Sequence, residues 1–325
     1  MDVIQLLTLA GVVVLVPTAL AVYIIGLEYV VRLLPDAAQP RVRPWIWVTP
    51  ALVFVALFLV YPTLGTIQIS LLDRAGNFVG LANYATVFND SGVIIAIRNN
   101  FLYWLVLYTV FVLVFGVLLA VLADRVRYET LLKSLIFMPM AISFVALGVI
   151  WKFMYSYQPA DAPQTGTMNA LVTTLFHAQP VTWLQDRAID NPALIATAIW
   201  GFTGFAMVIL SAALKGIPGD LLEAARVDGA GELTIFRRVI LPLLMPTITV
   251  VGTTLVIFAL KAFDIVYVMT GGNYDTDVLA NRMYLELTKF NQPGRAGAVA
   301  TILLLAVIPV LIFNLRQLRA VESRR

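Results

Sequence analysis

Residues 101–123 form a block without a single charged side chain. The block exceeds the roughly 20 apolar residues that an α-helix needs to cross the hydrocarbon core of a bilayer. Similar blocks recur along the chain, and charged residues make up only 13% of its 325 residues, against roughly 25% in an ordinary globular protein. Because lipid offers no partner for backbone polar groups, such spans fold as helices. The sequence therefore predicts an all-α, polytopic membrane protein.

About seven transmembrane helices are predicted. They lie at about 7–31, 46–71, 99–123, 134–156, 192–214, 243–266 and 296–314. The first contains a cleavage-like Ala-Leu-Ala at 19–21, but no basic residue precedes it and its apolar run continues to residue 34, which favours a retained helix. Residues 32–44 hold three prolines and three arginines and predict a stiff polar link. We therefore expect an extra N-terminal helix with its link, 1–44, and a six-helix body, 45–325.

A polar island interrupts the apolar sequence at residues 219–242. It predicts two short helices, 220–227 and 232–241, separated by Gly229 and Gly231. The first helix has an apolar side that suits a groove on a partner protein. That side is formed by Leu221, Leu222, Ala224 and Ala225. Charged residues would surround it as polar anchors: Arg226, Asp228, Arg237 and Arg238. The alternative reading is an ordinary solvated loop.

Basic residues orient a membrane protein, because the cytoplasmic loops carry the excess of Lys and Arg. With the polar island placed inside, the inner segments hold fourteen Lys and Arg residues and the outer segments six. We therefore expect a cytoplasmic C-terminus and an N-terminus outside. Two outer loops are long, 157–191 and 267–295, and the first includes a half-apolar stretch at 168–176 that predicts a short helix on the membrane surface.

The chemical equipment of an enzyme is missing from the sequence. There is no cysteine, the one histidine is His177 in a predicted loop, and no zinc-binding or nucleophile motif is present. We therefore expect no catalytic residue and no metal site. The phosphate-binding Gly-x-x-x-x-Gly-Lys-Ser/Thr loop is also absent, so any nucleotide would have to bind to another subunit. No basic cluster interleaved with aromatic residues indicates nucleic-acid binding.

Charged groups inside spans are costly and are functional candidates by default. Lys152 lies near the outer end of a span, where snorkelling to the interface accounts for it. Lys261 and Asp264 lie three residues apart, so on a helix they would share a face and neutralise one another. Two interpretations of Lys261 and Asp264 are open: they form a structural ion pair, or they line a translocation path. Asn99 and Asn100 open the third span, where they could cap a helix or face a translocation path, and capping is favoured.

The fifth span carries glycines among aromatic residues, which allow either close helix packing or space for a ligand. Aromatic rings beside such a space could stack on a sugar, and a hydroxyl could bind it. The candidate residues for a substrate path are Trp200, Gly201, Phe202, Thr203 and Phe205, together with Lys261 and Asp264. Packing of small residues with lipid-facing rings explains the glycine-aromatic pattern equally well.

The polar island also carries a recognisable motif. Glu-Ala-Ala at 223–225, Gly229 and Val-Ile-Leu-Pro at 239–242 resemble the cytoplasmic EAA loop of ABC importer permeases, with Val239 in place of the usual isoleucine. The stretches 134–145, 148–152, 204–218 and 261–272 are similar to those of carbohydrate ABC permeases. Among these the α-glucoside group, for sugars of the maltose, sucrose and trehalose type, is most similar and also has an extra N-terminal helix.

This resemblance implies the type I ABC importer permease fold in a bacterial inner membrane. The implied partners are a second permease, two ATP-binding subunits that carry ATP and Mg, and an extracytoplasmic sugar-binding protein. The implied coupling residues are Leu221, Leu222, Glu223, Ala224, Ala225, Asp228, Gly229 and Pro242. The asparagines that contact sugar in the maltose permease are replaced here by alanine or Lys261.

Alternatives to a sugar permease stay open at this stage. One is an ABC permease for another solute, such as glycerol phosphate. Another is a proton-coupled secondary transporter, for which Asp264 is almost the only carboxylate available as a proton site. A membrane-embedded enzyme is a third class, which the poor chemical equipment disfavours.

Overall fold

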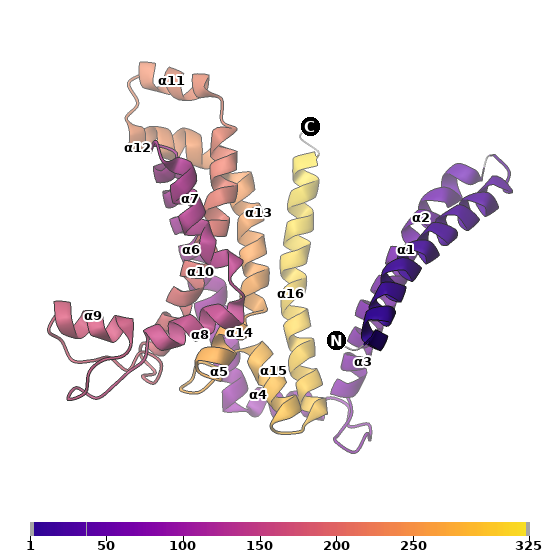
Figure 1. Ribbon diagram of the computed structural model, residues 1–325, viewed down its shortest axis with the longest axis horizontal. Helices are drawn as coiled ribbons and strands as arrows, with labels where there is room; N and C mark the ends of the chain where they lie inside the picture. Colours follow the sequence, from indigo (N-terminus) through magenta and orange to yellow (C-terminus); the bar gives the residue numbers. More distant parts are fainter. Residues whose placement is uncertain (1–2, 37, 323–325) are drawn as a thin grey trace. The chain divides into compact units, whose positions relative to one another are not determined.

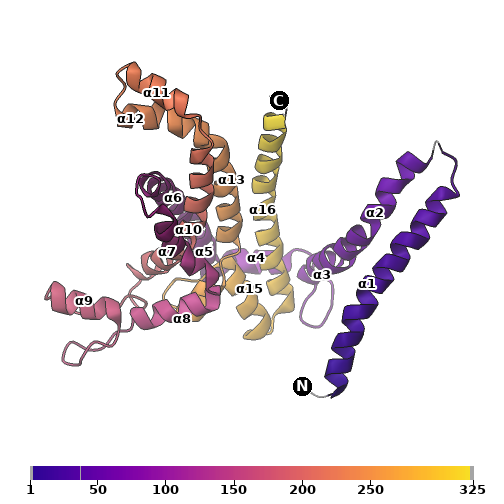
Figure 2. The same ribbon diagram turned by 45° about the horizontal axis from the view of Figure 1, so that its top comes forward.

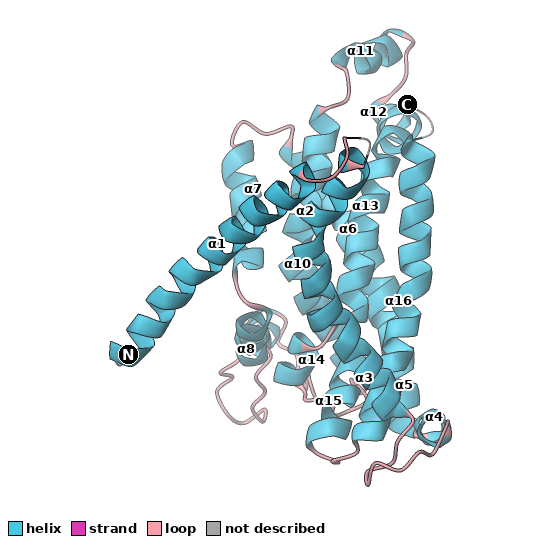
Figure 3. Cartoon of the chain, turned by 90° about the vertical axis from the view of Figure 1, so that its right-hand side faces the viewer, coloured by secondary structure: helices cyan, strands magenta, loops and turns pink. Residues whose placement is uncertain are grey.

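The computed structural model describes residues 3–36 and 38–322. These residues form helices joined by loops, with one isolated antiparallel bridge between Leu72 and Phe78 (Figure 3). The chain divides into two compact units, 1–66 and 67–325. The prediction of an all-α chain is confirmed.

The first unit is a helical hairpin. Helix α1 (Val3–Arg32) is followed by α2 (Gln39–Val55), which continues through η1 (Ala56–Val60) into α3 (Tyr61–Ser70). The Tyr23 hydroxyl donates a hydrogen bond to the Ile46 carbonyl at 3.2 Å, and Arg43 forms an ion pair with Glu28 at 2.8 Å. The predicted link is shorter than expected, because Pro40 opens α2 and Pro44 lies inside it. Proline at the first helical positions forfeits no hydrogen bond.

The second unit contains the remaining helices. They are α4 (Ala82–Asn89), α5 (Ser91–Asn99), η2 (Asn100–Tyr108), α6 (Thr109–Ala123), α7 (Glu129–Phe137), η3 (Met138–Ala141), α8 (Phe144–Met154), α9 (Thr167–Leu175), α10 (Asp190–Lys215), α11 (Gly219–Val227), α12 (Glu232–Ile235), η4 (Phe236–Ile240), α13 (Leu241–Leu260), α14 (Asp264–Met269), α15 (Leu279–Thr288) and α16 (Pro293–Glu322). Six helices along the described chain are long and apolar enough to span a membrane, and a bent pair makes a seventh. The predicted number of spans is confirmed.

The bent pair is the predicted fourth span, which is not one straight helix. Helices α7 and α8 meet at an angle of 99°. Pro139 lies in η3 between them, and Ile142 and Ser143 have extended backbones with ψ of 141° and 147°. Because proline lacks an N–H group and collides with the preceding turn, it ends a helix in mid-span. Helix α8 therefore lies across the direction of α7 and α10 (Figure 1).

The sixth span also differs from its prediction, but here the helix is longer and more continuous than expected. Residues from Glu232 to Leu260 form one continuous run through α12, η4 and α13. Pro242 and Pro246 lie in α13 without ending it. The wider π-helical turn of η4 directly precedes Pro242, and such local adjustments let membrane helices accommodate proline. The second predicted short helix is therefore the cytoplasmic end of a span.

Helix α10 forms the centre of the second unit. Of the 18 residues in its apolar segment, 67% are buried inside the protein, against 33% or less in the corresponding segments of the other spans. Small residues make the close approach possible: a Cβ on Gly116 of α6 would lie 2.6 Å from the Ala206 Cβ, and one on Gly201 would lie 2.7 Å from the Leu147 Cδ1. A Cβ on Gly204 would collide with the Ile136 carbonyl. The glycines of the fifth span therefore serve close packing.

Asn99 and Asn100 do not cap a helix, contrary to the prediction. Both are fully buried inside the continuous run from Ser91 to Ala123, and Asp90 caps it instead. The Asn99 side chain donates hydrogen bonds to the carbonyls of Asp275 (2.6 Å) and Asp277 (2.8 Å). The Asn100 side chain accepts one from the Leu279 N–H at 2.7 Å. The two asparagines therefore fix the loop between α14 and α15.

This loop buries a carboxylate. Asp277 accepts hydrogen bonds at one oxygen from the Asn281 side chain (2.6 Å) and the Val278 N–H (2.9 Å). Burial raises the pKa of Asp277 to about 6, because desolvation disfavours the charged form. An ordinary aspartate has a pKa of about 3.9. Below about pH 4 the protonated group imposes no penalty on the fold, and its stabilisation is lost as the pH rises through about 6.

We predict that Asp277→Asn removes this pH dependence. Between about pH 4 and 7 the wild-type chain should lose roughly 2–3 kcal/mol of stability that the variant retains, since the amide oxygen still accepts both hydrogen bonds. Thermal unfolding of both proteins in detergent measures the difference. Asp161→Asn, at an exposed loop carboxylate, is the control. Parallel pH profiles for wild type and Asp277→Asn would contradict the assignment.

Candidate functional site

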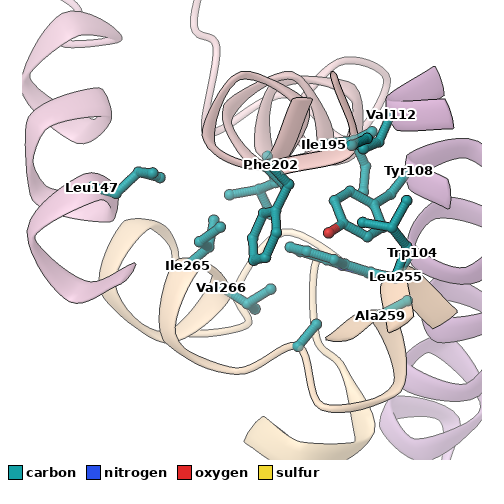
Figure 4. Packing of buried hydrophobic residues seen from close by; sticks show 14 of the residues in the cluster. Trp104, Tyr108, Val112, Leu147, Ile195, Phe202, Leu255, Ala259, Ile265 and Val266 are labelled. Carbon is teal, nitrogen blue, oxygen red and sulfur yellow. The ribbon is translucent and has the colours of Figure 1, made fainter. Parts of the chain in front are cut away.

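A cavity of about 160 Å³ lies within the second unit, where four spans meet. Its walls come from η2, α8, α10, α13 and the segment that leads into α14. The residues lining it are Trp104, Tyr108, Phe144, Phe202, Phe258, Lys261, Ala262, Phe263, Asp264 and Ile265. Figure 4 shows Trp104, Tyr108 and Phe202 converging on one space. Most of the lining is aromatic.

Two interruptions of the spans shape this cavity. Helix α8 begins at Phe144, directly after the bend of the fourth span. Helix α13 ends at Leu260, and the chain leaves helical geometry until α14 begins at Asp264. Lys261 therefore lies at the end of one helix and Asp264 at the start of another. The prediction that the two residues share one helical face is wrong.

Aromatic contacts hold the cavity wall together. The Phe202 ring lies 5.0 Å from Phe144 in a stacked arrangement, 4.9 Å from Phe258, and 5.6 Å from Tyr108 edge to face. These distances fall in the range at which aromatic pairs attract one another, worth about 0.5–1.5 kcal/mol per pair. Phe202 therefore connects three different helices around the space.

The polar groups of the cavity are few. Lys261 and Asp264 both line it, and no ion pair between them exists in the described structure. The Tyr108 hydroxyl and the Trp104 indole N–H are buried and have no hydrogen-bond partner among the described residues. The cavity thus combines aromatic faces with one positive and one negative group.

The predicted path residues divide into two groups. Phe202, Lys261 and Asp264 line the cavity. The others lie outside its lining: Trp200 packs at 5.6 Å against Trp151, Gly201 faces Leu147, the Thr203 hydroxyl donates to the Ile199 carbonyl at 2.7 Å, and Phe205 packs against the core.

Sequence reasoning missed five aromatic residues of the lining: Trp104, Tyr108, Phe144, Phe258 and Phe263. Within a span, an aromatic residue that faces lipid cannot be told from one that faces a cavity. One signal was available for the pair on η2, because Trp104 and Tyr108 lie four residues apart and so share a helical face.

A second candidate site is the predicted coupling loop, which forms α11, a turn and α12. Gly229 has φ of +77°, a conformation that favours glycine, and the Ala230 N–H donates to the Ala225 carbonyl at 3.0 Å. Both Figures 1 and 2 place α11 and α12 beyond the ends of α10 and α13. Helix α11 therefore projects from the bundle.

The side chains of α11 separate into two faces. Leu222 and Ala225 pack against a small core around Ile235, Ile240 and Leu244. The opposite face is open: Leu221 is 47% exposed and Val227 87%, and the side chains of Glu223, Ala224 and Asp228 are exposed as well. No residue of α11 is fully buried. Pro242 is exposed at the start of α13.

Ion pairs join this loop to the turn between α6 and α7. Glu232 pairs with Arg226 of α11 at 3.1 Å and with Arg125 of the turn at 2.8 Å. On the other side of α11, Lys215 at the end of α10 pairs with Glu129 of α7 at 2.6 Å. Lys133 contacts both Glu129 and the Ser211 hydroxyl. The coupling loop is therefore joined to the turn before α7 through Glu232, and the end of α10, just before the loop, is joined to α7 through Lys215.

Comparison with known proteins places the chain in a family. Residues 112–324 match the model of the binding-protein-dependent transport system inner membrane component. The chain is 53% identical over 281 residues to the osmoprotective compounds uptake permease protein GgtC of Synechocystis sp., covering 86% of this chain and 100% of the relative. It is 44% identical over 277 residues to the alpha-glucoside transport system permease protein AglF of Rhizobium meliloti, covering 85% and 82%.

A solved structure confirms the fold. A chain of a bacterial ABC transporter involved in the import of alginate superimposes with a TM-score of 0.74, covering 87% of this chain and 98% of that chain at 23% identity. At that identity the likeness concerns the fold alone, and it is the ABC importer permease fold that the sequence predicted. The chain belongs to the family of inner membrane components of binding-protein-dependent transport systems.

Proposed function

We propose that this chain is one of two permease subunits of an ATP-driven importer for an α-glucoside or another small oligosaccharide, and that it provides half of the translocation path. One observation carries the proposal: the same chain holds an aromatic cavity between its spans and a projecting helix, α11, whose outer face no part of the described chain covers. A cavity of this kind suits cargo, and a helix of this kind suits a partner that supplies force.

The lining of the cavity favours a neutral, amphipathic cargo. Aromatic faces offer contact to the C–H surfaces of a sugar ring, while polar groups bind its hydroxyls, as in most small-molecule sites. One lysine and one aspartate leave the cavity without net charge, so an anion such as glycerol phosphate finds no excess of positive groups. The relative in Rhizobium meliloti is named as an α-glucoside permease, which supports the same class of cargo.

The energy must come from other subunits, because the sequence has no phosphate-binding loop. In this proposal two ATP-binding subunits, with ATP and Mg, dock on α11 of this chain and on the matching helix of a second permease. The open face with Leu221, Glu223, Ala224 and Asp228 inserts into a groove of the ATPase, while Leu222 and Ala225 hold the helix to its own chain. Gly229 and Pro242 fix the direction of the loop.

The orientation follows from charge. Fourteen Lys and Arg residues on the side of the coupling loop, against six on the other, support a cytoplasmic loop and C-terminus and an N-terminus outside. A sugar-binding protein then delivers cargo to the outer loops. The solved alginate transporter was crystallised with a pentasaccharide-bound periplasmic protein, which supports this arrangement for a relative in fold.

The mechanism is alternating access. Closure of the ATPases draws the two coupling loops together and rocks the span bundles, so that the cavity opens to the outside and receives the sugar. ATP hydrolysis then returns the span bundles to their starting arrangement. Reconstituted transporter in liposomes tests the class: uptake should require ATP and the binding protein and should persist with an uncoupler. Uptake that an uncoupler abolishes and ATP does not support would indicate proton coupling through Asp264 instead.

We predict that Gly229→Val lowers transport about tenfold and leaves membrane insertion unchanged. No atom lies within 4 Å of the position where its Cβ would be, so the cost is the strained positive φ, about 1–3 kcal/mol. Gly231→Val is the matched control, since Gly231 has φ of −70° and equally open surroundings. Transport is measured as sugar uptake in liposomes. If Gly229→Val and Gly231→Val take up sugar equally well, the turn at Gly229 does not transmit force from the ATPase.

We also predict that the Glu232–Arg125 ion pair transmits motion from α11 to α6 and α7. Exposed pairs contribute about 0.2–1 kcal/mol, so Glu232→Arg or Arg125→Glu alone should lower uptake about two- to fivefold. The double exchange should restore the part of that loss that the contact with Arg125 carries, while the second pair of Glu232, with Arg226, stays broken. The rate of ATP hydrolysis stimulated by the binding protein should change less than the rate of sugar uptake. Arg127→Glu, in the same turn without a described ion pair, is the control; additive losses in the double variant would refute the link.

A further inference from the structure

An apolar groove of about 420 Å³ lies between α6 and α13, in the half of these spans that adjoins the coupling loop. We call it the inner groove. Its walls carry no charged side chain: they are formed by Leu113, Val114, Val117, Leu118, Phe236, Leu241, Met245 and Ile248. The walls are open to an occupant, since Val114 is 54%, Leu118 49% and Met245 51% exposed.

The length of the inner groove matches one leaflet of a bilayer. From Phe236 to Ile248 the helix advances about 18 Å at about 1.5 Å per residue, and half of a hydrocarbon core is about 15 Å thick. Further into the membrane α6 and α13 approach each other closely, because a Cβ on Gly252 would lie 3.4 Å from Leu113 Cδ1. The inner groove therefore runs from η4 to about the membrane centre, which is the reach of one acyl chain.

Two arginines lie at the η4 end of the inner groove. Arg237 and Arg238 directly follow Phe236 of the lining. Arg237 also lies four residues before Leu241, so these two residues share a helical face. Both arginine side chains are exposed, and neither takes part in an ion pair among residues 3–36 and 38–322.

Other basic residues at this end of the second unit are neutralised by carboxylates. Glu232 pairs with Arg125 and Arg226, and Glu129 pairs with Lys133 and Lys215. The two arginines of η4 therefore present uncompensated positive charge. Guanidinium groups bind phosphate oxygens through a planar fork of N–H donors, and basic side chains beside apolar spans on the cytoplasmic side attract anionic lipid headgroups.

We propose that the inner groove binds an anionic phospholipid, with one acyl chain against α6 and α13 and the headgroup phosphate bound by Arg237 and Arg238. Such a lipid has an anion at one end of an apolar chain, which is the order in which the site presents its charges and its apolar walls. The inference goes beyond cargo and ATPase docking, and it uses only the cytoplasmic orientation of the coupling loop.

Binding of dioleoyl phosphatidylglycerol to the full-length chain tests the site. The chain is purified in detergent with the subunits that accompany it, and a titration followed by native mass spectrometry gives the apparent Kd. Dioleoyl phosphatidylcholine, which has the same acyl chains and no net charge, should bind about tenfold more weakly. Arg237→Gln and Arg238→Gln should each weaken phosphatidylglycerol binding about fivefold, and the double variant about thirtyfold.

Two further variants separate the groove from the charge. Leu118→Trp fills the inner groove, so binding of both lipids should be lost, whereas the arginine variants should weaken phosphatidylglycerol binding selectively. Arg127→Gln removes the same charge from an exposed position in the turn beyond α6, and it should bind phosphatidylglycerol like wild type. Glycerol 3-phosphate, which carries the anion without an acyl chain, should not compete.

Three results would overturn the proposal. Equal affinity of the wild-type chain for the two lipids, or an unchanged preference in the double arginine variant, excludes a headgroup site on η4. A loss in Arg127→Gln as large as that in Arg237→Gln indicates general attraction to positive charge. If no lipid is retained and Leu118→Trp releases an accompanying membrane subunit, the inner groove is a contact between subunits. None of these readouts involves sugar uptake, so the proposed function is tested separately.

Discussion

A bilayer supplies no hydrogen-bond partner to a peptide group, so a span is broken only where protein surrounds the break. The second unit has two such breaks, between η3 and α8 and between α13 and α14. Both border the same cavity, through Phe144 on one side and Lys261 and Asp264 on the other. The place where regular helix structure is given up is therefore also the place where the cavity lies.

The cavity and the coupling loop are connected by continuous structure. The spans α10 and α13, which bring Phe202 and Phe258 to the cavity, are the two helices that carry α11 between them. Ion pairs at Glu232 and Lys215 join that loop to the turn before α7, and α7 leads through Pro139 to Phe144. Helix α11 is therefore linked to the cavity wall through α10, α13 and α7.

Hydropathy and one motif predicted much of this arrangement. The lengths of apolar blocks predicted the spans, and the spacing from Glu223 to Pro242 located the projecting loop, because both signals are local. The bend after Pro139 and the straight run through Pro242 were both missed, since proline ends or enters a helix according to the packing around it. Asn99 and Asn100 were misread as caps because their partners lie about 180 residues away. Trp104 and Tyr108 were missed because an apolar block hides which face is inside.

The central claim is that ATP acting at the coupling loop opens this one cavity to alternate sides of the membrane. The chain contains no cysteine, so Ala262→Cys places a single thiol in the cavity lining. Labelling by an impermeant maleimide added outside measures access. We expect labelling in the ATP-trapped complex with loaded binding protein and protection without ATP. Equal labelling in both states, in a variant that still transports, would contradict alternating access through this cavity.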